Sequence, residues 1–152
     1  MKLTIELVPN TSWGNNIRAL MTKRQWNALR GMICDRAWGT CVICGNSEQS
    51  LECHEVWSYN EKTQIQKLTG LLALCPNCHM VKHFGLARVQ GKQDEASKHL
   101  RKVNGLNKQQ AEDYVKEAFR IWRDRNQYYW TLDLSYLKRY GIDPEKLKAP
   151  NE

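Results

Sequence analysis

The sequence of 152 residues lacks any apolar run approaching the roughly 20 residues needed to cross a bilayer. Its opening stretch, MKLTIELVPN, alternates and carries a glutamate, so it also lacks the continuous apolar block of a signal peptide. Low-complexity tracts and internal repeats are missing as well. These absences argue against membrane-spanning, repeat and largely disordered proteins. We expect a cytoplasmic globular protein with no membrane association.

Acidic residues are too few to balance the basic ones. The formal charge is +7 and the isoelectric point is near 9.2. This excess does not determine a fold, but it favours a polyanionic partner such as DNA. The length suits one domain, in which a metal site would add substantially to stability.

Four of the six cysteines form two Cys-x-x-Cys pairs, Cys41/Cys44 and Cys75/Cys78. In a chain without a signal peptide, such pairs favour reduced thiolates on a metal over disulfides. Two such turns supply the closed tetrahedral set that structural zinc prefers. A redox dithiol is the alternative, but it needs only one pair and a thioredoxin-like setting. Gly45 suits the tight turn after the first pair. We interpret the remaining Cys34 and Cys53 as small buried apolar residues.

Three histidines are left over once four cysteines saturate a zinc ion. His79 and His83 lie four residues apart on a predicted helix and so share one face, and His54 lies on a predicted strand upstream. Each alone could be an ordinary polar residue. Together they could hold one divalent ion with open positions for water and a phosphate oxygen, as metal-assisted hydrolysis requires.

The remaining sequence predicts a mixture of strands and helices. Ala111, Val115, Ala118, Phe119 and Trp122 form an apolar stripe that we expect to belong to the core. The expected elements are an edge strand at 2–8, a helix at 22–37, a strand at 51–59, a short helix from Asn60 to about 68, a strand at 71–74, a helix after Cys78 ended by Gly85, a helix at 93–103, a long helix after Asn107, an extended segment at 128–134 and a short helix at 135–140.

A known family shares the central pattern. The stretches LECHEVW at 51–57 and GLLALCPNCHMVKH at 70–83, framed by Cys41 and Cys44, resemble the HNH endonuclease family in its zinc-stapled form. The resemblance implies an α+β fold with a ββα-metal core, a four-cysteine zinc staple and flanking N- and C-terminal helices. It also implies a catalytic divalent ion, such as Mg²⁺, Mn²⁺ or a transition metal, that cleaves DNA.

The family pattern also implies roles for single residues. Aligned on Leu51-Glu52 and Val56, the ligand position falls on His54 and the position of the histidine base falls on Glu55, with His79 and His83 as the helix ligands. Glu55 could instead be a metal ligand. Gly70 stands where the family has an asparagine. An alternative register makes Cys53 the ligand and His54 the base, but it loses the match at Val56.

We therefore expect a metal-dependent DNA endonuclease in which Glu55 orients or deprotonates the attacking water. Lys82 contacts a phosphate in this hypothesis, or is simply an exposed lysine. The alternatives are a catalytically degenerate zinc protein that binds DNA or protein, and a nuclease subunit whose C-terminal helices dock on a protein partner. The expected organisation is an N-terminal strand and helix at 1–40, an HNH-like core at 41–85, a helical extension at 86–143 and a loose tail at 144–152.

Overall fold

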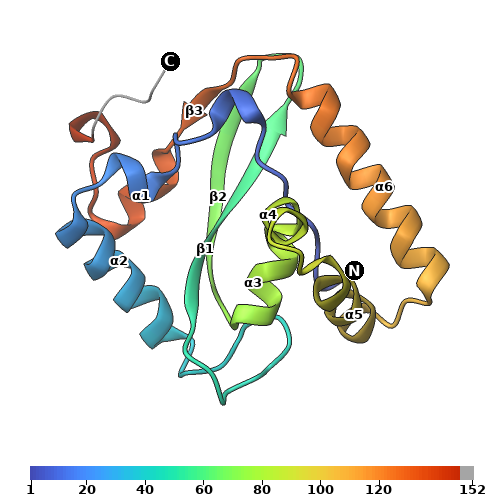
Figure 1. The fold of residues 1–152 in the computed structure, drawn as a ribbon. Coiled ribbons are helices and arrows are strands. Elements are labelled where there is room, and N and C mark those ends of the chain that lie inside the picture. Colours follow the sequence, from blue (N-terminus) through green and yellow to red (C-terminus); the bar gives the residue numbers. More distant parts are fainter. Residues whose placement is uncertain (148–152) are drawn as a thin grey trace.

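A small sheet with helices on both sides forms the fold, which the computed structural model describes for residues 1–147. Within these residues the sheet has three strands in the order β1-β2-β3. Strand β1 (Glu52–Asn60) is antiparallel to β2 (Ile65–Leu74), and β3 (Thr131–Asp133) is parallel to β2. Figure 1 shows α1 and α2 on one side of the β1–β2 hairpin and α3 to α6 on the other. The α+β class is confirmed.

The hairpin replaces the short helix that we expected from Asn60 to about 68. The side-chain oxygen of Asn60 accepts hydrogen bonds from the N–H groups of Lys62 and Thr63, at 3.0 and 3.1 Å. Asparagine favours both helix starts and turns, because its side chain mimics a backbone acceptor in either. The alternating burial that begins at Ile65 selects the strand, so the helix prediction is wrong.

Helix α2 (Lys23–Arg36) begins where the sequence indicates. The side chain of Thr22 accepts from the Gln25 N–H, and the Gln25 side chain accepts from the Thr22 N–H, which completes a capping box. Trp26, Leu29 and Ile33 form its buried face. The short helix α1 (Ile17–Leu20) and a 3-10 turn (Asn10–Ser12) precede it.

The C-terminal helices also follow the local signals. Helix α5 (Gln93–Asn104) ends at Gly105, whose φ of 66° is the left-handed conformation that glycine adopts readily. Asn107 and Gln110 form a second capping box at the start of α6 (Lys108–Arg125), which buries Ala111, Val115 and Phe119. A 3-10 helix over Ser135–Tyr140 follows β3.

The helix after the second cysteine pair is interrupted earlier than expected. Helix α3 (Pro76–Lys82) stops at His83, where ψ is 52°, and α4 (Phe84–Val89) starts at once. Gly85 lies inside α4, so the prediction that it closes the helix is wrong. The break turns the chain at His83.

Residues 2–9, here called the N-terminal strap, do not form the predicted edge strand. The strap has no regular secondary structure, and the Glu6 N–H donates to the Lys82 carbonyl at 3.0 Å, which joins the strap to the end of α3. Leu3 and Ile5 are buried, as their alternation suggested. Alternation reports which side chains are buried, and it does not require a neighbouring strand.

One hydrophobic cluster joins the parts of the chain. It contains Leu3 from the strap, Leu29 from α2, Leu74 from β2, Leu100 from α5 and Phe119 from α6. The segment expected as a loose tail begins with a 3-10 turn at Pro144–Lys146, and its residues 148–152 lie outside the described part of the chain. Within residues 1–147, no helix combines the length and apolar character that a membrane span requires.

Candidate metal centres

The four predicted cysteine ligands come together at one end of the hairpin. The sulfur atoms of Cys41, Cys44, Cys75 and Cys78 all lie within 4.8 Å of one another. The Cys44 and Cys75 sulfurs are 3.6 Å apart. A tetrahedral ion with metal–sulfur bonds of about 2.3 Å places its sulfurs about 3.8 Å apart. The group can therefore hold a metal ion of zinc's size, and all six cysteines of the chain are free thiols.

Local backbone geometry forms each cysteine turn. In the first, Gly45 donates its N–H to the Cys41 carbonyl at 3.0 Å. Its φ of 79° is a backbone conformation that would be strained in a residue with an L side chain. In the second, Cys75 is the N-cap of α3, and its sulfur accepts the Cys78 N–H at 3.4 Å. Both turns direct thiols to the same point.

Burial and mutual repulsion act on the thiols when no cation lies among them. Burial raises the pKa of Cys78, and the neighbouring cysteines raise it further. Burial alone would also raise the pKa of Cys41, but backbone N–H groups of Cys44, Cys75 and Ile43 outweigh it and lower this pKa to about 7. A bound cation would relieve the repulsion and allow all four to ionise.

His99 is a contact of this cluster that the sequence reasoning missed. It lies on α5, and its Nε2 is 3.2 Å from the Cys78 sulfur. In the tautomer that carries the proton on Nε2, the ring donates to the thiolate, as groups just outside a metal's ligands commonly do. No motif spacing indicates this contact, because it depends on α5 packing against α3.

The second cluster contains His54, His79 and His83. His54 projects from β1, His79 from α3, and His83 from the break after α3. One nitrogen from each lies within 4.8 Å of the others. Their ring centroids are 4.6 to 5.4 Å apart. The three predicted ligands thus form a group that can hold one metal ion.

Two carboxylates bind the histidines from outside the cluster. Oε2 of Glu6 lies 2.5 Å from Nε2 of His54, and Oε2 of Glu52 hydrogen-bonds Nδ1 of His79. A carboxylate places the ring proton on the nitrogen that faces it, which leaves the other nitrogen with a free lone pair. Nδ1 of His54 is buried and has no hydrogen-bond partner in residues 1–147. Such an atom is destabilising when left alone, and a metal ion at the cluster would satisfy it.

Burial keeps two of the histidines neutral. It lowers the pKa of His83 to about 4, together with the neighbouring His79 and His54. Burial also lowers the pKa of His54, although Glu6 opposes this. Neutral imidazole is the form that binds metals, so both rings are ready for a ligand role at neutral pH.

Comparisons with protein-family models, with curated proteins and with solved structures give no match to this chain. The resemblance to HNH endonucleases stays a prediction from the quoted residues.

Glu55, which the resemblance places at the base position, does not join the histidine cluster. Its Oε1 accepts the Ile17 N–H at 2.6 Å at the start of α1. Neighbouring residues of a strand point to opposite faces, so Glu55 and His54 diverge. Burial raises the pKa of Glu55 to about 7, against the effect of the Ile17 and Arg18 N–H groups. This geometry fits a carboxyl group that packs α1 against the sheet.

Lys82 is not the exposed phosphate contact that we expected. Its side chain is 4% exposed, and Nζ donates to Oγ1 of Thr4 at 2.8 Å and lies 3.4 Å from Oε2 of Glu6. Burial alone would raise the pKa of Glu6, but His54 and Lys82 outweigh it and lower this pKa. Lys82 is therefore the buried counterion of Glu6.

Two further positions enter the family comparison, Cys53 and Gly70. Cys53 is buried, and burial together with the nearby Cys34 raises its pKa to about 12. It is not in the histidine group, so the alternative register gains no geometric support. Gly70 pairs with Val56, and a Cβ added at Gly70 would lie 3.6 Å from Val56 atoms, an ordinary contact.

Proposed function

We propose that this chain is a metal-dependent endonuclease that hydrolyses DNA phosphodiester bonds on an HNH-like ββα-metal core. The observation that carries the proposal is the histidine cluster, in which one nitrogen from each of His54, His79 and His83 lies within 4.8 Å of the others. The contacts with Glu6 and Glu52 also support the proposal, because they place the ring protons of His54 and His79 on the nitrogens that face away from the cluster. The formal charge of +7 favours a nucleic-acid substrate.

We propose that zinc occupies the four-cysteine group as a structural ion. Four thiolates saturate a tetrahedral zinc ion and leave no position for substrate. The ion would join the turn before β1 to the start of α3, which carries His79. The zinc group therefore positions the histidines and takes no part in the chemistry.

The three histidines would hold Mg²⁺, Mn²⁺ or another divalent ion at the second cluster. Such an ion supplies positive charge for the developing negative charge on the phosphate and the departing oxygen. His54 and His83 remain neutral for this role, and Glu6 and Glu52 fix the ring orientations of His54 and His79. Glu55 is not part of the proposal, because its carboxylate binds the Ile17 N–H.

A second candidate is a catalytically degenerate zinc protein that binds DNA or a protein partner. The position of Glu55 favours it, since neither Glu55 nor Gly70 supplies the polar group expected at the histidine site. A partner at the C-terminal helices would meet the exposed face of α6, because Ala111, Val115 and Phe119 are buried within this chain.

An assay of plasmid cleavage by the zinc-loaded protein distinguishes the nuclease from the catalytically degenerate zinc protein. We expect nicking with at least one of Mg²⁺, Mn²⁺ and Ni²⁺, and its loss in His83→Ala. A Glu112→Gln variant on the exposed face of α6 is the matched control and should cleave as the unmodified protein does. DNA binding without cleavage under every metal would overturn the nuclease proposal and favour the second candidate.

A further inference from the structure

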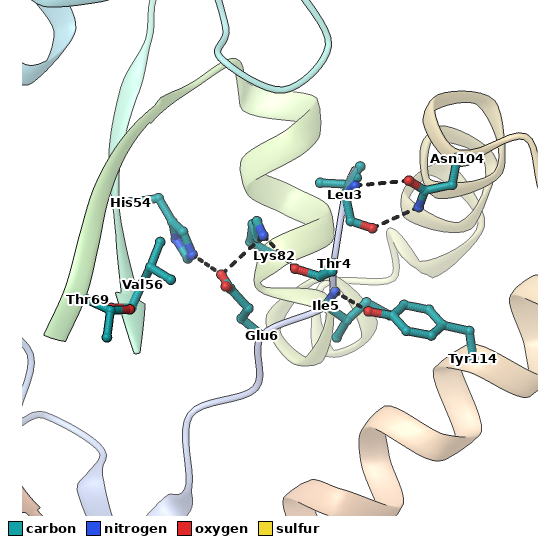
Figure 2. Close-up of polar contacts among 10 residues, drawn as sticks. All are labelled: Leu3, Thr4, Ile5, Glu6, His54, Val56, Thr69, Lys82, Asn104 and Tyr114. Carbon is teal, nitrogen blue, oxygen red and sulfur yellow. Dashed lines mark hydrogen bonds and ion pairs between the residues drawn. The ribbon is translucent and has the colours of Figure 1, made fainter. Parts of the chain in front are cut away.

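The N-terminal strap is fixed by contacts with two helices that are distant in sequence, α5 and α6. The side chain of Asn104, at the end of α5, accepts the Leu3 N–H at 2.9 Å and donates to the Leu3 carbonyl at 2.8 Å. The hydroxyl of Tyr114, on α6, accepts the Ile5 N–H at 3.0 Å. Figure 2 shows these contacts on the same side of the strap. Further along α6, Trp122 donates to the Val8 carbonyl at 3.0 Å.

The strap carries Glu6 to the histidine cluster. Figure 2 shows the Glu6 carboxylate between His54 of β1 and Lys82 of α3. The Glu6 N–H donates to the Lys82 carbonyl, so backbone and side chain of Glu6 are both held at α3. Lys82 is held in turn by Thr4, two residues before Glu6. The carboxylate is thus fixed from both sides.

The contact with Glu6 decides which nitrogen of His54 is available. With the proton on Nε2 facing Glu6, the lone pair is on Nδ1, the buried nitrogen without a hydrogen-bond partner in the described chain. Without Glu6, the ring could carry its proton on either nitrogen and could rotate. Carboxylate partners of this kind both orient a metal-binding imidazole and raise its basicity.

We propose that Glu6 is the positioning residue of the histidine site, and that α5 and α6 serve this site by bracing the strap. Glu6 acts through His54 and touches no substrate. The inference rests on the metal-binding part of the proposed function and is independent of DNA cleavage. It also extends the site beyond residues 41–83, because the central stretch alone does not contain the strap or its braces.

Metal affinity at the histidine site tests this role. Zinc-loaded protein would be titrated with Ni²⁺ or Mn²⁺ by calorimetry, with zinc content and melting temperature measured in parallel. We expect Glu6→Gln to bind the second ion about 10- to 100-fold more weakly than the unmodified protein. Glu55→Gln is the matched control, because it alters the neighbour of His54 on the opposite face, and its affinity should be unchanged.

Glu6→Gln leaves Lys82 as a buried charge without its partner, which could unfold the chain. The double variant Glu6→Gln with Lys82→Met removes both charges, and we expect it to fold and to remain weak in metal binding. Unmodified affinity in this folded double variant, or an equal loss in Glu55→Gln, would overturn the inference.

A second readout needs no second metal. Nitrogen-15 spectra of the imidazole rings in zinc-loaded protein report which nitrogen carries the proton. We expect the Nε2–H form at His54 in the unmodified protein and in Glu55→Gln, and a mixture in Glu6→Gln. An Nδ1–H form in the unmodified protein would overturn the inference. Absence of plasmid cleavage beside the expected spectra would overturn the nuclease proposal alone.

Discussion

The cysteine cluster and the histidine cluster share α3, yet they depend on different parts of the chain. Both pairs of cysteines belong to short turns at the same end of the hairpin, and each turn is shaped by its own backbone, as at Gly45 and Cys75. His54 of the histidine cluster instead contacts Glu6, which is 48 residues away in sequence and lies on a strap held by α3, α5 and α6. The cysteine cluster therefore depends on short backbone turns, whereas the histidine cluster depends on contacts between segments that are far apart in the sequence.

This difference assigns separate work to the two clusters. With a metal ion bound, the cysteine cluster would hold the hairpin and α3 together and should control whether the chain folds. The histidine cluster sits on that framework and should control what the folded chain binds. Each cluster also has a polar contact with a residue outside the hairpin and α3. His99 contacts the Cys78 sulfur, and Glu6 contacts His54. Substitutions should therefore separate folding from binding.

The largest expected effect comes from Cys75→Ser. Binding of structural zinc contributes about 10–16 kcal/mol in small zinc domains, whereas a typical domain is stable by about 5–15 kcal/mol. We expect loss of zinc by elemental analysis and loss of cooperative unfolding by circular dichroism. The matched Cys34→Ser variant, outside the cluster, should keep its zinc. A folded, zinc-free Cys75→Ser protein would show that the cysteine cluster is not a structural site.

A smaller effect is expected from His99→Ala, which removes the donor at the Cys78 sulfur. Loss of such an outer contact typically weakens metal affinity about 10- to 100-fold. Competition with a chromophoric chelator would measure it. His99→Gln keeps an N–H donor and should recover part of the affinity. The comparison predicts little change at the histidine site, so equal losses at both sites would break the separation between the two clusters.

The smallest effect is expected from Tyr114→Phe. It leaves the Ile5 N–H without its acceptor, at a cost of about 1–3 kcal/mol in the free energy of unfolding. Thermal denaturation would measure this cost, with Tyr129→Phe as control because the Tyr129 side chain is 77% exposed. Metal affinity should fall modestly at the histidines and not at the cysteines. A loss of metal affinity at the cysteines with none at the histidines would contradict the proposal that α6 braces the strap.

Local chemistry explains what the sequence predicted well. The capping residues Thr22 and Asn107 act on N–H groups three residues away, so their effect can be derived without tertiary structure. The two cysteine pairs likewise form turns of only a few residues. The grouping of the four thiols agrees with the spacing of the two pairs. His79 and His83 also lie together as predicted, but His83 lies at the break after α3 and not within the helix.

The sequence predictions failed where contacts between distant segments determine the structure. Alternation at residues 2–8 cannot distinguish an edge strand from a strap that packs between helices. The Glu6 partner of His54 has no signal in local spacing. The Glu55 assignment had a local warning, since adjacent residues of a strand point to opposite faces and Glu55 could not face the site together with His54.

The strap also sets an order of events during synthesis. Its contacts with Asn104, Tyr114 and Trp122 span 101, 109 and 114 residues of chain. A ribosome produces the strap before its braces, so Glu6 has no fixed place until α6 has emerged. The cysteine turns need only the chain up to Cys78. The four cysteines of a growing chain can therefore come together well before the histidine site takes its final form.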